Sequence, residues 1–177
     1  WLDVCCGRAW HFSNIPDGDR FEKTGIDISR EHIKVAKENN PASEFICDDF
    51  LDYDFKEKSF DVVSCFWGSY CYLNTQDQIY EFINKMINLT SVGGGIYLEA
   101  ISPHSVTTFP GSNYERDSFS SVELLTKDAS RWKFIDFGGT HVLLSPPLED
   151  ILKFLKKSFS IVRCSHASWG VHHVICH

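Results

Sequence analysis

The sequence predicts an α/β fold with a doubly wound, mostly parallel sheet and flanking helices. Three observations support this prediction. Short apolar runs recur along about the first hundred residues, amphipathic helical patterns lie between them, and the runs do not alternate with polar residues. Apolar strands separated by helices are typical of βαβ units, in which helices cover both faces of a parallel sheet.

Length and composition indicate one compact globular domain. The chain has 177 residues, 43% of them hydrophobic and 23% charged, which suits a single core. A formal net charge of −7 provides no basic surface for a phosphate backbone, so we expect a small-molecule partner and no nucleic acid. The sequence contains neither an apolar stretch long enough to span a membrane nor a signal peptide, so no membrane partner is expected.

The cysteines and the first residue bear on the setting of the protein. There are 7 cysteines, an odd number, and several lie in apolar runs such as Phe45–Cys47. This pattern favours buried thiols over disulfides, so we expect a reducing, cytoplasmic compartment. Because the sequence begins with Trp1 inside a predicted strand and without an initiator Met, we expect it to be a piece of a longer protein.

The apolar runs are the predicted strands of the first part of the chain. They cover residues 1–5, 24–28, 44–47, 60–66 and 95–101. Ser29 has the side chain of an N-cap for a helix over Arg30–Asn39. Thr75 and Gln78 form a capping-box pair before a second amphipathic helix, and the run Gly93–Gly95 is expected to end that helix.

The alternation of strands and helices stops after the fifth strand. Residues 102–144 are rich in Ser, Thr, Gly and aromatics, and strand-like pieces on either side of Gly138-Gly139 predict a small antiparallel insertion. A helical stripe from Leu148 and two further strand candidates would complete the sheet. We therefore expect a single domain over residues 1–177, divided into a first half over 1–101, an insertion over 102–147, and a last helix with closing strands over 148–177.

The residues that follow the first strand indicate a ligand. In a doubly wound sheet, ligands bind beyond the carboxyl ends of the strands. The segment Asp3-Val4-Cys5-Cys6-Gly7-Arg8-Ala9 resembles the D-x-G-x-G-x-G loop of class I S-adenosylmethionine-dependent methyltransferases. Gly7 keeps the central glycine, where the backbone must approach a ligand closely, and Cys5 and Ala9 replace the first and third glycines. The fold that this resemblance implies is Rossmann-like.

A second segment that resembles this family follows the second strand. Asp27 lies 20 residues after Gly7, at a position where an acidic side chain accepts hydrogen bonds from both ribose hydroxyls of a nucleoside. A carboxylate makes charge-assisted hydrogen bonds there of about 1.5–3 kcal/mol each. Capping of the following helix is the alternative role of Asp27.

Two more segments complete the resemblance. Asp49 and Phe50 align with the G-D-A segment of the family, which meets the adenine; Asp48 is the competing choice, and a solvated acidic loop is the alternative. Cys65 and Phe66 end a strand that resembles the F-D-x-V strand of the family. The resemblance implies S-adenosylmethionine as cofactor and S-adenosylhomocysteine as product. It implies cofactor contacts at Asp3, Cys5, Gly7, Asp27, Ile28, Asp49, Phe50, Cys65 and Phe66.

Methyl transfer from a sulfonium mainly requires alignment of the nucleophile, so a catalytic base is not essential to this prediction. The candidate catalytic residues are Tyr70 and His104, which follow the fourth and fifth strands. Tyr72 and Glu99 are further polar groups near these strand ends, and the aromatic face of Trp67 can hold a cation. Core packing is the alternative role of these aromatic residues.

The insertion over 102–147 is expected to form a lid over the acceptor site, because it is longer than ordinary structureless connections. Its candidate acceptor contacts are His104, Tyr114, Arg116 and His141. A surface elaboration or an oligomer contact is the alternative.

The sequence therefore predicts an enzyme that methylates O, N or C of a small molecule. The alternatives are a noncatalytic S-adenosylmethionine-binding or partner-binding domain of the same fold, and an RNA-modifying methyltransferase. An NAD-dependent oxidoreductase is less favoured, because Ala9 and Trp10 would crowd a pyrophosphate. The histidines and cysteines of residues 164–177 lack the spacing of a recognised zinc site, so no metal is expected.

Overall fold

The chain forms two compact units. The computed structural model describes residues 1–16, 20–56, 58–109, 121–136, 138–166 and 170–177. The first unit consists of Trp1–Phe66 and Glu81–Tyr97, and the second of Trp67–Tyr80 and Leu98–His177. Helix α3 (Gln76–Leu89) and strand β5 (Thr90–Ala100) each contribute residues to both units.

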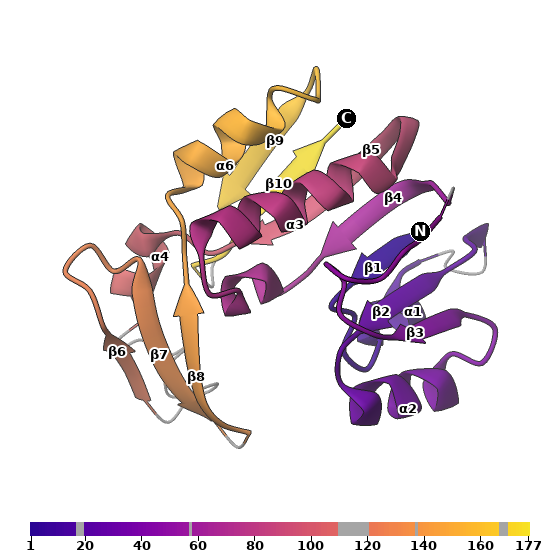
Figure 1. Cartoon of the computed structure of the whole chain (residues 1–177), viewed down its shortest axis with the longest axis horizontal. Coiled ribbons are helices and arrows are strands. Elements are labelled where there is room, and N and C mark those ends of the chain that lie inside the picture. The colour runs from indigo at the N-terminus through magenta and orange to yellow at the C-terminus, as the bar shows by residue number, and fades with distance from the viewer. Residues whose placement is uncertain (17–19, 57, 110–120, 137, 167–169) are drawn as a thin grey trace. The chain divides into compact units, whose positions relative to one another are not determined.

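The first unit holds a parallel sheet. Its strands are β1 (Leu2–Val4), β2 (Thr24–Asp27), β3 (Glu44–Cys47), β4 (Phe60–Cys65) and most of β5, in the order β3-β2-β1-β4-β5. Strand β1 lies between β2 and β4 and runs parallel to both, as Figure 1 shows, with Asp3 opposite Gly25 on one side and Ser64 on the other. The first four predicted strands are confirmed to within one residue at each end.

The helix starts of this part of the chain agree with the predicted caps. Helix α2 (Arg30–Asn39) follows Ser29, whose hydroxyl accepts a hydrogen bond from a backbone N–H of the first turn at 3.2 Å. Ahead of α3, the Thr75 hydroxyl accepts from the Gln78 N–H, and the Gln78 side-chain oxygen accepts from the Thr75 N–H, each at 3.2 Å. Both predicted caps are therefore confirmed.

The expectation that Gly93–Gly95 end α3 is wrong. The helix ends at Leu89, and β5 begins with the next residue and contains all three glycines. A Cβ added to Gly94 would lie 2.8 Å from the carbonyl oxygen of Asp61. Close approach of the two backbones, and not termination of the helix, therefore requires glycine at this position.

A buried cluster packs two helices against the sheet of the first unit. Helix α1 (Trp10–Asn14) contributes Phe12, and α2 contributes Ile33 and Ala36; these residues pack with Phe45 of β3. Burial of a side chain the size of Phe contributes about 1.5–3 kcal/mol to the free energy of unfolding. The cluster therefore fixes the loop between β1 and α1 to the sheet.

Among its described residues, the second unit contains two antiparallel arrangements and, besides the start of α3, three short helical elements. One is the three-stranded sheet of β6 (Ser121–Leu124), β7 (Arg131–Asp136) and β8 (Gly139–Leu144), in that order. The other is the antiparallel pair of β9 (Val162–His166) and β10 (His172–Cys176), in which β10 follows β5 in the strand order. The helical elements are η2 (Ser69–Tyr72), α4 (Pro103–Thr107) and α6 (Leu148–Leu155). The predicted antiparallel insertion is confirmed, and β6 and α4 are elements that sequence analysis missed.

Trp132 anchors the core of the second unit. It lies on β7 and is 1% exposed, and its indole N–H donates a hydrogen bond to the hydroxyl of the buried Ser145 at 3.0 Å. The ring of Phe109 packs edge-on against it with the ring centroids 5.6 Å apart. The small sheet is therefore integrated into a hydrophobic core through its middle strand.

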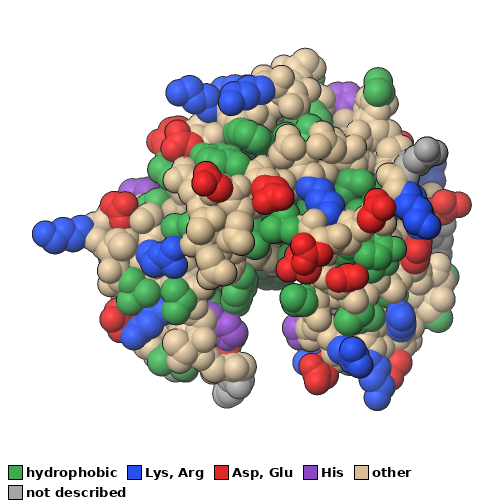
Figure 2. Space-filling view, viewed as in Figure 1, with side chains coloured by type: hydrophobic (Ala, Val, Ile, Leu, Met, Phe, Trp, Pro, Cys, Tyr) green, Lys and Arg blue, Asp and Glu red, His purple; other side chains and the backbone are tan. Residues whose placement is uncertain are grey.

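Charges of both signs and free cysteines are two further features of the described chain. On the face shown in Figure 2, blue Lys and Arg side chains are interspersed with red Asp and Glu side chains. All seven cysteines are free thiols, and burial raises the pKa of Cys71 and of Cys176 to about 12. In the described part of the chain, no helix combines the length and the apolar character that a membrane span requires.

Candidate active site

The loop after β1 has an alternating left-handed backbone. Cys5, Gly7 and Ala9 have φ angles of 57°, 55° and 53°, a region that residues other than glycine rarely adopt. These are the three positions at which the resembling motif has glycine. A Cβ added to Gly7 would meet nothing within 4 Å, so open space lies beside the middle of the loop.

Strain at Cys5 leads to a prediction about stability. A left-handed conformation costs an L-residue about 1–2 kcal/mol, and substitution by glycine removes this cost. Glycine also loses more conformational entropy on folding, which offsets part of the stabilisation. We expect Cys5→Gly to raise the free energy of unfolding by about 0.5–1 kcal/mol in urea denaturation. Cys47→Gly is the matched control, because Cys47 is an exposed residue of β3, and it should lower stability. Equal destabilisation by both substitutions would contradict the strain at Cys5.

Asp27 connects this loop to the start of α2. One carboxylate oxygen accepts a hydrogen bond from the Gly7 N–H and the other from the Ser29 N–H, each at 2.8 Å. Nδ1 of His32 lies 3.8 Å from the second oxygen, and the Asp27 side chain is 12% exposed. The structure therefore brings Asp27 and Gly7 together, and Asp27 also supports the helix start. Each oxygen has a further lone pair with which to accept a ribose hydroxyl.

The segments predicted to meet the adenine have different surroundings. Ile28 follows Asp27 and is 72% exposed, an unusual exposure for a large aliphatic side chain. One oxygen of Asp49 accepts the Leu51 N–H at 2.8 Å, while Asp48 accepts the N–H of Asp49 at the same distance. The ring of Phe50 is buried among aromatic residues of the core, so only the backbone of Phe50 remains for a ligand.

Asp3 lies inside the sheet. It is 1% exposed and accepts a hydrogen bond from the Ser64 hydroxyl at 2.7 Å. The Ser64 hydroxyl in turn accepts from the Trp1 indole N–H, also at 2.7 Å. This buried series of hydrogen bonds joins the neighbouring strands β1 and β4, so Asp3 supports the strand from which the loop begins.

An aromatic pocket of 390 Å³ adjoins the end of β4 in the first unit. The Phe66 ring stacks on the His11 imidazole, with centroids 3.6 Å apart and planes at 17°, and it also packs against Tyr97 at 4.9 Å. Trp10 lines the same pocket. Cys65, which precedes Phe66 in the chain, is fully buried. Sequence analysis missed His11; its position at the start of the helix that follows the loop was the available signal.

The structure separates the two tyrosines that follow β4. Tyr70 is fully buried, and its hydroxyl oxygen accepts a hydrogen bond from the Ile101 N–H at 3.3 Å. This position makes Tyr70 part of the core of the second unit and does not present its hydroxyl to a substrate. Tyr72 is 49% exposed.

Tyr72 belongs to a cluster of polar side chains. Its hydroxyl lies 3.3 Å from Nδ1 of His141 on β8, and Nε2 of His141 lies 3.0 Å from a carboxylate oxygen of Asp136 on β7. Partial burial raises the pKa of Tyr72 to about 12, and the nearby charge of Asp136 acts in the same direction. The cluster joins two residues proposed from the sequence, Tyr72 and His141, to Asp136, which sequence analysis missed.

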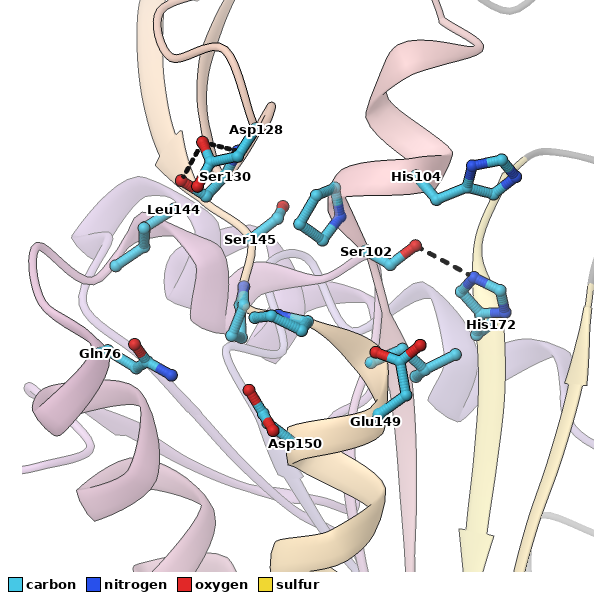
Figure 3. A pocket seen from close by; sticks show the side chains of 14 residues that line it. Gln76, Ser102, His104, Asp128, Ser130, Leu144, Ser145, Glu149, Asp150 and His172 are labelled. Carbon is cyan, nitrogen blue, oxygen red and sulfur yellow. Dashed lines mark hydrogen bonds between the residues drawn. The ribbon is translucent and has the colours of Figure 1, made fainter.

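His104, the second predicted catalytic residue, lies in a different pocket of the second unit. This pocket has a volume of 660 Å³, and Figure 3 shows His104 of α4 and His172 of β10 on one side, with Glu149 and Asp150 of α6 below them. Ser102 lies 3.3 Å from Nε2 of His172. Burial, and then the neighbouring His166 and His104, lower the pKa of His172. The predicted contacts Tyr114 and Arg116 lie outside the described residues.

Glu99 has two partners near the end of β5. One carboxylate oxygen accepts the Trp67 N–H at 2.7 Å, and the other lies 3.7 Å from Nδ1 of His173. Glu99 therefore fixes the backbone of the residue that directly follows Phe66.

The parallel sheet, the glycine-type loop after β1 and the carboxylate after β2 define a Rossmann-like, nucleotide-binding fold. Residues 2–94 match a family model described as "Methyltransferase domain", which spans more than half of the chain. The chain belongs to this methyltransferase domain family. The predicted enzyme class, a class I S-adenosylmethionine-dependent methyltransferase, and its cofactor are thereby confirmed. The comparison with curated proteins gives no match.

Solved structures have the same fold. The PH0226 protein from Pyrococcus horikoshii OT3 is 18% identical, with 99% of this chain and 80% of that chain covered and a TM-score of 0.76. The sugar N-methyltransferase KedS8 from Streptoalloteichus sp ATCC 53650 is 18% identical (99% and 79% covered, TM-score 0.69). The amino pentose methyltransferase CalS10 from Micromonospora echinaspora is 17% identical (99% and 81%, TM-score 0.68). The predicted Rossmann-like fold is confirmed.

Proposed function

We propose that this methyltransferase transfers the methyl group of S-adenosylmethionine to O, N or C of a small-molecule acceptor. The observation that carries the cofactor half of the proposal is the hydrogen bond between Gly7 and Asp27, which joins a left-handed loop beside open space to a carboxylate able to accept ribose hydroxyls. The small-molecule acceptor is supported by KedS8 and CalS10, which are described as methyltransferases of a sugar and an amino pentose. The interspersed charges on the face in Figure 2 agree with it.

The cofactor supplies a sulfonium-bound methyl group that is already activated for attack. The work left to the protein is to hold the donor, align the acceptor and exclude water, and orientation alone can contribute about 7–11 kcal/mol. Asp27 and the loop around Gly7 would hold the ribose and the methionine part. Ile28 and the backbone of Phe50 would contact the adenine, and the aromatic ring of Phe66 would face the sulfonium.

The insertion is the part of the chain that we propose for recognition of the acceptor. Residues 102–147 contain the antiparallel sheet of β6, β7 and β8, and we retain the proposal that this insertion selects the acceptor. Residues 1–101 would then be the cofactor half of one domain, and 148–177 its closing part. The compartment would be cytoplasmic, in keeping with seven free thiols.

S-adenosylhomocysteine should bind, because it keeps every cofactor contact except the methyl group. Isothermal titration of the full-length protein should give a one-site isotherm with this product, and NAD should give no heat. No heat with S-adenosylhomocysteine at millimolar concentration would contradict the proposal.

Catalysis is tested separately with tritiated S-adenosylmethionine. Label should enter the small-molecule fraction of a cell extract and not its RNA. Label in RNA would favour the RNA-modifying alternative. Binding without any transfer would favour the noncatalytic one.

A further inference from the structure

We propose that the 660 Å³ pocket of the second unit binds a small organic amine with an apolar carbon body. Every residue that lines this pocket belongs to the second unit, so the site requires no contact between the two units. Binding of an amine goes beyond the proposed function and does not depend on it, because no cofactor takes part. Residues 102–147, proposed above to recognise the acceptor, provide more than half of the lining.

The lining of the pocket has a large apolar part. Its apolar residues are Pro103, Leu144, Pro146, Pro147 and Leu148. Three of these five are prolines, whose rings restrict the backbone and give this part of the wall a fixed shape. The volume lies within the range of about 300–1,000 Å³ that is usual for small-molecule sites. The apolar part therefore favours a ligand with a carbon body.

Carboxylates line the pocket from two separate elements. Figure 3 shows Asp128, in the turn between β6 and β7, on one side, and Glu149 and Asp150 of the first turn of α6 on another. Among the described residues, no hydrogen bond or ion pair occupies the two carboxylates of α6. Acidic residues stabilise a helix start, but Asp128 lies outside any helix. Since the lining contains no Lys or Arg, the pocket attracts a cation such as an ammonium group.

The protonation states of the lining residues maintain this negative charge at neutral pH. Hydrogen bonds from Thr126 and Ser130 lower the pKa of Asp128, and the Ser130 hydroxyl donates at 2.8 Å. The carboxylate of Asp128 is therefore ionised. Burial is the largest cause of the lowered pKa of His172, so its imidazole is neutral and adds no positive charge to the pocket.

His172 and nearby hydroxyl groups form a polar part of the wall. Nε2 of His172 lies 3.3 Å from the hydroxyl oxygen of Ser102 and 3.1 Å from that of Ser105. The Ser102 hydroxyl also accepts the Ser105 N–H at 3.1 Å, which caps α4. These contacts fix the position of the imidazole. A few polar groups beside an apolar lining are typical of a small-molecule site.

Benzylamine is the probe for this site, because its ammonium and its ring match the two parts of the lining. Benzyl alcohol is the neutral control of nearly the same shape. In ¹⁵N-labelled full-length protein, millimolar benzylamine should shift the backbone amide signals of Ser102 and Ser145 in a saturable manner. Benzyl alcohol should bind about 10-fold more weakly, because it lacks the charge. Absence of saturable shifts would overturn the site, and equal affinity for the two probes would overturn its preference for an amine.

Substitutions test the carboxylates. Glu149→Gln combined with Asp150→Asn should weaken binding of benzylamine by about 10-fold, and Asp128→Asn alone by about 3-fold. The matched control is Glu31→Gln combined with Glu38→Gln, which removes two negative charges from α2 in the first unit and should keep the parent affinity. Equal weakening in this control would show that benzylamine responds only to the net charge of the chain, and it would overturn the site.

The variant Asp128→Asn separates contact with the ligand from a weakened helix start, because its position lies outside α6. Thermal unfolding followed by circular dichroism shows whether each variant keeps its fold. Parent affinity in Asp128→Asn and in the double variant of α6, with the fold retained, would overturn the role of the carboxylates. No cofactor is present in these titrations. A failure of S-adenosylhomocysteine to bind would therefore refute the proposed function and leave the result for benzylamine unaffected.

Discussion

Asp27→Ala should weaken binding of S-adenosylhomocysteine by at least about 100-fold. The two ribose hydroxyls would lose charge-assisted hydrogen bonds of about 1.5–3 kcal/mol each, and about 2.8 kcal/mol already corresponds to a factor of 100. The Gly7 N–H would also lose its acceptor, so the loop would be less well ordered before the ligand arrives. Isothermal titration measures the affinity, and thermal unfolding followed by circular dichroism shows whether the fold persists.

Two variants sharpen this test. Asp27→Asn keeps an oxygen that accepts hydrogen bonds but removes the charge, so its affinity should lie between those of the parent and Asp27→Ala. Asp54→Ala removes an acidic residue whose carboxylate accepts the Lys56 N–H, and it should bind like the parent. If Asp27→Ala binds as tightly as the parent, Asp27 is only a helix cap and the ribose site lies elsewhere.

Gly7→Val should abolish detectable binding of S-adenosylhomocysteine. A β-branched residue at φ 55° is strained, and its side chain would fill the open space beside the loop in which the methionine part is expected. We expect a loss beyond the range of isothermal titration, together with a fall of about 1–3 kcal/mol in the free energy of unfolding.

Gly93→Val separates strain from occlusion. Gly93 also has a positive φ, 81°, with nothing within 4 Å of an added Cβ, and it lies in β5, away from the predicted cofactor residues. This variant should lose stability and keep its affinity for S-adenosylhomocysteine. Equal loss of binding in both variants would show that Gly7 acts through folding alone.

Local rules predicted the elements whose causes are local. Two helices are capped by the side chains of Ser29 and of the pair Thr75 and Gln78, each at most three residues from its partner. Both partners of each hydrogen bond therefore lie in one short segment, and the sequence alone predicts the cap. Gly94 shows the limit of such rules. Glycine is compatible with a helix stop and with close strand packing, and only the carbonyl of Asp61, 33 positions earlier, decides between them.

The sequence predicted site residues that directly follow a strand. It did not predict the role of a residue whose hydrogen-bond or stacking partner lies far away in the chain. Tyr70 and Tyr72 are two positions apart in a short helical turn, and the sequence could not tell that Ile101 binds the first while His141 binds the second. The stack of His11 on Phe66 likewise joins residues far apart in the chain. The roles of these side chains depend on tertiary contacts, which the spacing of residues along the sequence does not predict.

Positions 5, 7 and 9 share a left-handed backbone, although only Gly7 is glycine. Residues other than glycine therefore adopt the left-handed backbone at two of these three positions. A pattern search written in residue letters scores Cys5 and Ala9 as mismatches, although both residues have the left-handed backbone that glycine favours. Diverged chains with altered glycine loops should accordingly be recovered by comparing backbone torsions.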